Sequence, residues 1–211
     1  MRFLAGFLVG LLVVVLVGAG VVYTGSYNVA ASTPPSKMET KLASFALNKA
    51  VARRASNAKN PFPVSPEVLR DGFDHYKEMC VVCHGAPGVD VSELGQGLNP
   101  PAPDLTLPRV QGRTDGEMFW IVCNGIKMSG MPAFCPTHKT DQVWKIVAFV
   151  RHLEQLTPEE QKSLKAVTEE MEHGREEGEA APKTETKEGE APAAQATPGH
   201  THAPGTEPHK D

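Results

Sequence analysis

The chain has 211 residues and a formal net charge of −4, a length that indicates one compact domain with appended segments. The charge is uneven, because nine acidic and four basic side chains lie between Glu172 and Asp211, which leaves +1 for residues 1–171. Neither part is basic enough to indicate a nucleic-acid-binding protein. The sequence contains no G-x-S-x-G motif and no phosphate-binding glycine loop, which argues against two common enzyme classes.

The first predicted element is a hydrophobic helix. No charged residue occurs from Phe3 to Tyr23, and about 20 apolar residues are enough to span the hydrocarbon layer of a bilayer. Residues 1–23 are therefore predicted to form a transmembrane anchor. The alternative is a cleaved signal peptide with Val29-Ala30-Ala31 at the cleavage site, although signal peptides usually have a shorter apolar run of about 7–15 residues. In both cases the rest of the chain is exported.

The charges beside this helix do not support export. Only Arg2 precedes the apolar run and six basic residues follow it, against the positive-inside rule. These residues are Lys37, Lys41, Lys49, Arg53, Arg54 and Lys59. Export is therefore inferred from the N-terminal segment itself and from the cysteine motif described below.

Residues 24–64 are predicted to be a linker that contains one helix, at residues 37–55. Basic residues surround its apolar side. The apolar residues assigned to that side are Met38, Leu42, Phe45 and Val51. A basic amphipathic helix beside a membrane span can lie on anionic lipid headgroups or serve as a plain spacer, and the sequence leaves both open.

The compact domain is predicted at residues 65–156 and is expected to be mainly α-helical. Pro66 and Glu67 are both favoured in the first turn of a helix, and this helix leads directly to Cys80. The stretch 85–112 is rich in glycine and proline, so we expect it to be mostly loop.

Two further helices are predicted in this domain and one after it. Thr114-Asp115-Gly116-Glu117 has capping-box spacing and opens a helix through Val122. An apolar stripe follows Thr140-Asp141 in the last helix of the domain. Residues 157–174 are predicted to form a helical extension. Residues 175–211 are predicted to be a disordered acidic tail, because they contain almost no large apolar residue.

Residues 80–84 are Cys-Val-Val-Cys-His, the string for covalent haem attachment. The thiols of Cys80 and Cys83 lie on one turn and can each form a thioether with a haem vinyl group, and His84 is then placed to ligate the iron. A redox-active pair, half of a zinc site and an ordinary disulfide are alternatives. The chain has no second C-x-x-C or H-x-x-x-H to complete a zinc site, and no βαβ pattern typical of a redox pair. We therefore predict one covalent haem c.

A low-spin electron carrier needs a second axial ligand. Met131 follows His84 by 47 residues and lies between Gly130 and Pro132. Glycine lets the backbone approach a flat cofactor, and a thioether ligand favours ferrous iron. Met131 is the predicted ligand, and Met128 is its main rival.

Two further cysteines, Cys123 and Cys135, bracket Met131. In an oxidising compartment a disulfide between them would close a short loop, and would stabilise it by about 3 kcal/mol on the chain-entropy model. The alternative is a pair of free thiols.

Taken together, these motifs resemble the class I cytochromes c, in particular their single-haem, membrane-anchored members, over roughly residues 65–156. In that family a glycine and an aromatic residue precede the first haem cysteine by eight and four positions and pack against the C-terminal helix. Gly72 and Tyr76 hold those positions here, and the resemblance places Ile146 and Phe149 opposite them.

The resemblance also implies site residues. The family's ligand loop has its methionine before a proline, which matches Met131. A loop proline of the family orients the proximal imidazole through its carbonyl group, and Pro100 or Pro101 can take this role here.

The function implied by the resemblance is the transfer of single electrons between respiratory redox partners, without catalysis. The haem domain is expected on the periplasmic side of the inner membrane. The alternative is an electron-transfer subunit of a larger dehydrogenase or terminal oxidase complex. A haem sensor or peroxidase-like enzyme needs an open iron position, and a methionine ligand argues against that. No nucleic-acid partner is expected.

Overall fold

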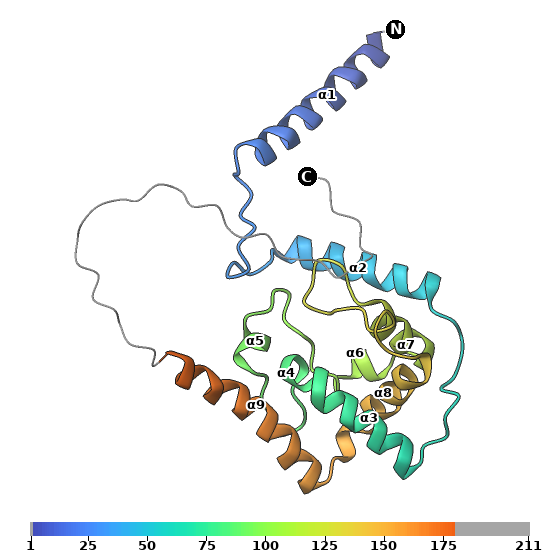
Figure 1. Cartoon of the computed structure of the whole chain (residues 1–211). Coiled ribbons are helices and arrows are strands. Elements are labelled where there is room, and N and C mark those ends of the chain that lie inside the picture. The colour runs from blue at the N-terminus through green and yellow to red at the C-terminus, as the bar shows by residue number, and fades with distance from the viewer. Residues whose placement is uncertain (1, 180–211) are drawn as a thin grey trace, which may run out of the picture. The chain divides into compact units, whose positions relative to one another are not determined.

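The computed structural model describes residues 2–179, with side chains described for residues 2–171. Its helices are shown in Figure 1. In chain order they are α1 (Arg2–Tyr23), α2 (Lys37–Arg54), α3 (Pro66–Met79), α4 (Val81–His84), α5 (Glu93–Gln96), α6 (Pro108–Gln111), α7 (Asp115–Asn124), α8 (Thr140–His152), the 3₁₀ turn η1 (Leu153–Gln155) and α9 (Pro158–Glu179). The described residues form no strand, only an isolated bridge between Ala86 and Val89. The mainly α-helical prediction is confirmed.

Local capping explains where three of these helices begin. The hydroxyl groups of Ser36, Ser65 and Thr114 each accept a hydrogen bond from a backbone N–H in the first turn of the following helix. Thr114 also forms the predicted capping box, because its backbone N–H donates a hydrogen bond to the Glu117 carboxylate.

Two helices are longer than predicted. α7 continues two residues beyond its predicted end, to Asn124, because the helix ends only where Gly125 takes a φ of 63°. α9 continues to Glu179, since its internal glycines, Gly174 and Gly178, each cost a helix only about 1 kcal/mol. The predicted tail at 175–211 therefore begins in a helix, and its remainder, 180–211, lies outside the described residues.

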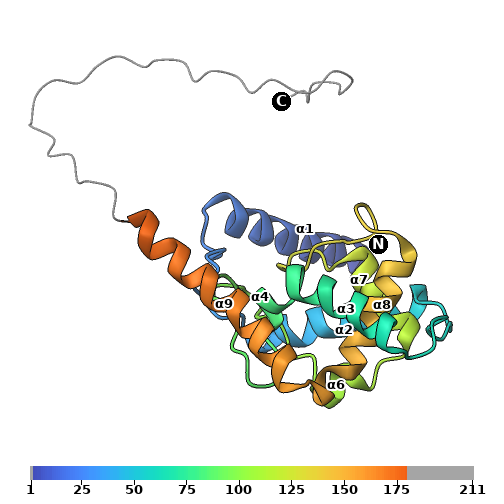
Figure 2. The ribbon, with the colours of Figure 1, turned by 60° about the horizontal axis from the view of Figure 1, so that its bottom comes forward.

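The core forms where α3 crosses α8, as Figures 1 and 2 show. A side chain at Gly72 would meet the Lys145 carbonyl oxygen, and its Cβ would lie 2.8 Å from the Phe149 Cβ. The rings of Tyr76 and Phe149 lie 5.3 Å apart between centroids. Ile146 is buried on the same helix. The predicted packing of Gly72 and Tyr76 against Phe149 is confirmed.

α2 has apolar residues on two opposite faces, which corrects the sequence prediction. Val51 is completely buried, whereas Met38, Leu42 and Phe45 are exposed. Val51 follows Leu42 by nine residues, which is two and a half turns at 3.6 residues per turn, so the two side chains lie on opposite sides. Val51 therefore does not share a face with the other three.

The segment that follows α2 is attached to the domain by hydrogen bonds. Asn60 donates from its backbone N–H to Asp115 Oδ2 (3.1 Å) and from its side-chain amide to the Trp144 carbonyl (2.7 Å). Phe62 packs against the hydrophobic core. Packing therefore begins before residue 65.

α9 is part of the packed domain. It contacts α3 and α4, and Figure 2 shows it running beside α4. Leu164 is completely buried in the cluster that contains Tyr76 and Phe149. Gln161 Nε2 donates to the Pro87 carbonyl at 3.0 Å. The helix after the predicted domain thus covers the turn that carries residues 81–84.

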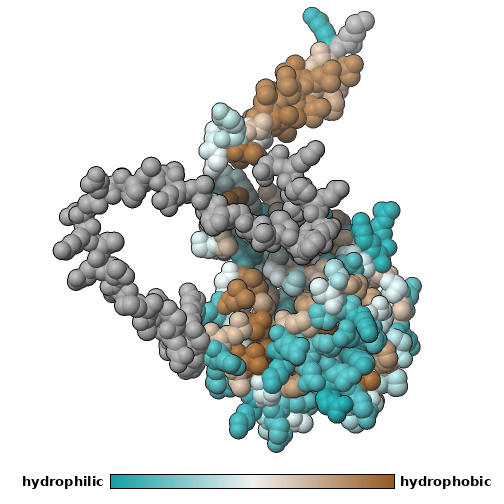
Figure 3. Space-filling view, in the orientation of Figure 1, coloured by the Kyte–Doolittle hydropathy of each residue, from teal (hydrophilic) through white to brown (hydrophobic). Residues whose placement is uncertain are grey.

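Among the described helices, α1 is the one long and apolar enough to cross a membrane. None of its residues is buried against protein, and its apolar side chains form a continuous surface in Figure 3.

Candidate functional site

The cysteine–histidine motif lies in a short helix that continues from α3. Cys80 is the residue that ends α3, and α4 begins at the next residue. Cys80 is buried and Cys83 is half-buried, and both are free thiols. The two other cysteines of the chain are bridged to each other. An ordinary disulfide between Cys80 and Cys83 is therefore not formed in this structure.

The environment of these thiols disfavours redox catalysis. Burial, and to a lesser degree the neighbouring Cys83, raises the pKa of the Cys80 thiol to about 12. Burial also raises the pKa of Cys83. A catalytic cysteine pair requires a lowered pKa, because the thiolate is the nucleophile. Within residues 2–171 no three His, Cys, Asp or Glu side chains are grouped to hold a metal ion, which leaves the zinc alternative without further ligands.

His84 is oriented by a backbone carbonyl. Its Nδ1 lies 2.8 Å from the Pro103 carbonyl oxygen, so Nδ1 carries the hydrogen and donates it. Burial lowers the pKa of the His84 imidazole, and the hydrogen bond to Pro103 opposes this shift only in part. The ring is therefore neutral, with Nε2 left as a lone-pair donor for a metal.

The carbonyl that orients His84 is not the one predicted. Pro100 and Pro101 were the expected partners, and Pro103 makes the contact instead. All three prolines lie within four residues. Each has a fixed φ and lacks an N–H group, so their local chemistry is the same. Only the path of the loop decides which carbonyl reaches the imidazole.

Tyr76 links the cysteine–histidine motif to α3 through a hydrogen bond. Its buried hydroxyl donates to the Gly85 carbonyl at 2.6 Å, which fixes the residue after His84 to α3. Sequence reasoning assigned Tyr76 a packing role and missed this hydrogen bond. A tyrosine, rather than phenylalanine, at a buried position nine residues before a glycine was the available signal.

The loop that carries Met131 begins at the end of α7. Gly125 has a positive φ, and a side chain there would also collide with the Met131 and Pro132 backbone. The Ile126 N–H donates to the Met131 carbonyl at 3.1 Å. The Ser129 hydroxyl donates to the Ile126 carbonyl at 2.8 Å and accepts from the Met131 N–H at 3.2 Å. These bonds fold the loop back on itself.

Met131 and Met128 differ in exposure. Met131 is half-buried, whereas Met128 is 97% exposed and has a φ of 58°. The loop also contacts the part of the domain that carries the cysteine–histidine motif, because Gly130 lies directly against the Leu98 side chain. Leu98 in turn follows α5, whose Gly95 packs against Cys83. Contacts therefore run from the motif to the residue beside Met131.

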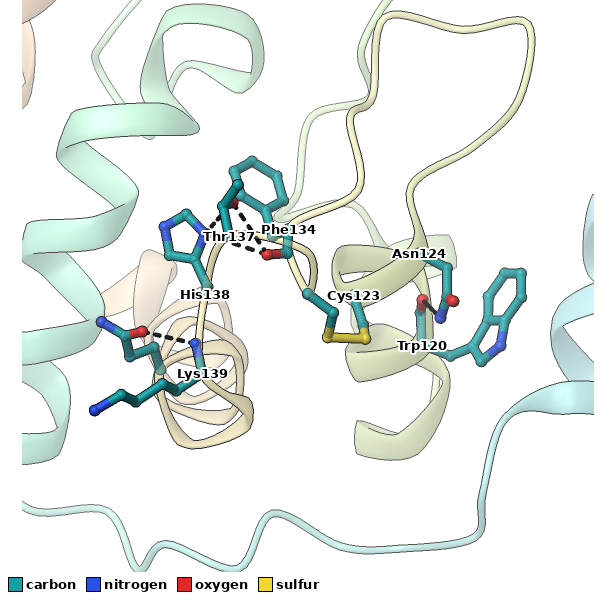
Figure 4. Close-up of a disulfide and its surroundings, with 9 residues drawn as sticks. Trp120, Cys123, Asn124, Phe134, Thr137, His138 and Lys139 are labelled. Atoms are coloured by element: carbon teal, nitrogen blue, oxygen red, sulfur yellow. Dashed lines mark hydrogen bonds between the residues drawn. A yellow bond between two sulfur atoms is a disulfide. The ribbon is translucent and has the colours of Figure 1, made fainter. Parts of the chain in front are cut away.

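The base of this loop is closed by a disulfide. Cys123 and Cys135 are bridged, with their Cα atoms 4.6 Å apart, and Figure 4 shows the bond joining the end of α7 to the returning chain. The Cys135 N–H donates to the Cys123 carbonyl at 3.0 Å, and the Phe134 N–H to the Val122 carbonyl at 3.2 Å. One covalent bond and two hydrogen bonds therefore hold the two ends together.

Comparison with known families gives one match. Residues 67–150 match the family described as cytochrome C oxidase, cbb3-type, subunit III. These residues form a class I c-type cytochrome domain. A comparison with curated proteins finds no match.

The residues of the cytochrome domain fit a haem. Two free thiols lie three positions apart on one turn, beside a neutral imidazole whose Nδ1 is already bonded to Pro103. A soft thioether ligand is available from the loop that contains Met131. These donors are an imidazole nitrogen and a thioether sulfur rather than carboxylate oxygens, so they suit iron in haem better than a hard cation.

Proposed function

We propose that this protein is a membrane-anchored monohaem cytochrome that transfers single electrons between respiratory redox partners, and that it is not itself an enzyme. The observation that carries the proposal is the pair of free thiols beside the His84 imidazole, within a domain of the cytochrome c family. Bound haem supplies an iron that alternates between the ferric and ferrous states and so carries one electron.

The residues of the chain take defined roles in this proposal. Cys80 and Cys83 hold the porphyrin through two thioethers. His84 ligates through Nε2, and Pro103 fixes the orientation of its ring. Met131 supplies the second ligand from a loop closed by the disulfide. If His84 and Met131 both bound the iron, they would leave no position on the metal for a substrate.

The direct test is mass spectrometry of the exported protein together with haem staining of a denaturing gel. The proposal expects one added haem mass that survives denaturation. A polypeptide of unmodified mass would contradict it, because the two thiols would then have another use.

Two methionine variants test the second ligand. Met131→Ala should keep the haem attached but remove the methionine–iron absorption band in the far red, and should let carbon monoxide bind the reduced protein. Met128→Ala is the matched control from the same loop, and should leave both properties unchanged because its side chain is 97% exposed. The opposite pattern would assign the ligand to Met128.

The membrane part of the proposal rests on α1. Its 22 residues are long enough for a roughly 30 Å hydrocarbon layer. In this proposal the domain that follows lies on the periplasmic side. Covalent haem and a disulfide both suit an oxidising compartment. Retention of the protein in membranes after alkaline carbonate extraction would support a retained anchor, and release would indicate a cleaved or peripheral protein.

The family match favours a second candidate. The matched family is described as a subunit of a cbb3-type oxidase, so this chain can also be the electron-transfer subunit of a larger terminal oxidase. Purification in mild detergent separates the two functions. A free carrier would purify alone, whereas a subunit would purify with larger membrane proteins in fixed proportion.

A further inference from the structure

α2 combines a face fixed to the domain with an opposite face that no described residue covers. On the first face, Val51 is completely buried, and Leu47, one turn earlier, is half-buried. The helix packs on α7, and Arg113 Nη2 donates to Asn48 Oδ1 at 2.7 Å. α2 therefore moves with the haem domain rather than as a loose spacer.

The opposite face carries three large apolar side chains. Met38, Leu42 and Phe45 expose 78%, 67% and 61% of their surfaces. Their spacing of four and three residues places them in one stripe along the helix. Burial within the domain therefore explains one face of α2, and the exposed stripe requires another partner.

Positive charge accompanies the stripe. Lys37 and Lys41 line the same shallow hollow as the three apolar side chains, and the Lys49 ammonium group lies 5.7 Å from the centre of the Phe45 ring. The helix has five basic residues and one acidic residue. That acidic residue, Glu39, is engaged at the start of the helix by hydrogen bonds from the Ser36 N–H and the Tyr27 hydroxyl.

The chain itself keeps this helix close to a bilayer. Residues 24–36 connect α1 to α2, and about 13 residues reach at most roughly 45 Å when fully extended. A membrane that α1 spans is therefore always within reach of α2, at a high effective concentration. Exposed apolar residues flanked by lysines are typical of helices that lie in the headgroup region of anionic membranes.

We propose that α2 lies in the headgroup region of the bilayer that α1 spans. Met38, Leu42 and Phe45 enter the edge of the acyl region, and Lys37, Lys41 and Lys49 contact anionic phospholipid headgroups. The inference rests on the proposed anchor. Because α2 packs on α7, the position of α2 in the headgroups gives the haem domain one orientation on the membrane. This orientation determines which face of the domain redox partners can contact.

The test is hydrogen–deuterium exchange of the full-length holoprotein in lipid nanodiscs. One set of discs contains phosphatidylcholine alone, and the other contains equal amounts of phosphatidylcholine and phosphatidylglycerol. Amides of residues 37–46 should exchange at least tenfold more slowly in the anionic discs, because all three lysines are attracted to an anionic surface. Amides of α8 should be unaffected.

Two triple variants identify the surface responsible. Met38→Gln, Leu42→Gln and Phe45→Gln together should abolish the slower exchange, while the visible haem spectrum stays unchanged because the stripe does not contact the domain. Thr40→Gln, Ala43→Gln and Ser44→Gln form the matched control on exposed positions outside the stripe, and should keep the slower exchange.

The outcomes separate this inference from the proposed anchor. Equal exchange in both kinds of disc, with the protein still resistant to carbonate extraction, would overturn the inference and leave the anchor intact. Slower exchange that occurs only when another membrane protein is added would also overturn it, in favour of a protein partner. Release of the wild-type protein by carbonate would remove the anchor on which the inference depends.

Discussion

The turn that carries Cys80, Cys83 and His84 and the loop that carries Met131 are held in place by different means. The turn lies between α3, α5 and α9. Val81 within it is completely buried, and the Tyr76 hydroxyl ties its end to α3. The Met131 loop is largely exposed, and is held by its own hydrogen bonds and by the disulfide at its base.

The two residues proposed to ligate the haem iron, His84 and Met131, are therefore held in place by different kinds of contact. His84 lies on a turn held by the buried Val81 and by the Tyr76 hydroxyl, and its ring is bonded to Pro103, so its release should accompany unfolding of the domain. Met131, the proposed second ligand, is held by the closure of its loop, and a loop can open locally at a lower free energy than global unfolding. As the denaturant concentration rises, the Met131 loop should therefore open before the domain unfolds.

The largest effect is expected from His84→Ala, which removes the proposed proximal ligand. The variant should yield no stable low-spin holoprotein, because Met131 alone cannot hold the iron in a loop of this kind. The measurement is the visible spectrum of purified protein, with haem staining to report attachment. A normal low-spin spectrum would show that another residue ligates on the proximal side.

The next effect concerns the distal side. Replacing Cys123 and Cys135 together by serine should destabilise the loop by about 3 kcal/mol, since the bridge closes a short loop with a sequence separation of 12. The methionine–iron band should then disappear at a lower guanidinium concentration than the helical signal. Loss of both signals at one guanidinium concentration would mean that the Met131 loop and the turn at residues 80–84 unfold together, which would contradict the difference described above.

Tyr76→Phe tests the proximal support alone. It leaves the Gly85 carbonyl buried without its donor, which should cost about 2 kcal/mol in the free energy of unfolding. Guanidinium denaturation followed by circular dichroism measures the change, and the methionine–iron band should be retained below the transition. Tyr23→Phe, at a position that is 94% exposed, is the control, and should change stability by less than about 0.5 kcal/mol.

The smallest effect concerns α7, the helix from which the distal loop departs. Burial raises the pKa of Asp115, but the Asn60 N–H and the Arg151 guanidinium outweigh it, so the pKa is lowered overall. A carboxylate with a lower pKa in the folded state stabilises fully above about pH 4, and this contribution is lost as the pH falls further.

Asp115→Asn should therefore cost about 1 kcal/mol at neutral pH and should remove part of the loss of stability below about pH 4. Denaturation curves at several pH values measure both quantities. The same pH dependence in the wild type and the variant would assign the acid sensitivity to other carboxylates.

Much of the fold could be predicted from local signals. The caps at Ser65 and Thr114 and the glycine after α7 are short-range features, and each depends on residues within about four positions. The proximal motif is equally local, because its two thiols and its imidazole lie within five residues. Such features are visible in the sequence without knowledge of the packing.

The features that the sequence did not reveal depend on distant contacts. Val51 was assigned to the wrong face of α2, because only the position of α7 shows which side of the helix is buried. Pro103, rather than Pro100 or Pro101, reaches His84 because of the path of the loop. The docking of α9 depends on Leu164 meeting a core formed by residues far earlier in the chain.

The burial of Leu164 has a practical consequence for defining an autonomous folding unit. The segment related to the cytochrome family stops at residue 150, but Leu153 and Leu164 beyond it are both almost fully inaccessible to solvent. A protein shortened to residues 67–150 would expose to solvent the apolar surface of α3 and α4 that α9 covers. The segment that matches the family, residues 67–150, is therefore shorter than the stretch that must be expressed to obtain a soluble haem domain, which has to include Leu164.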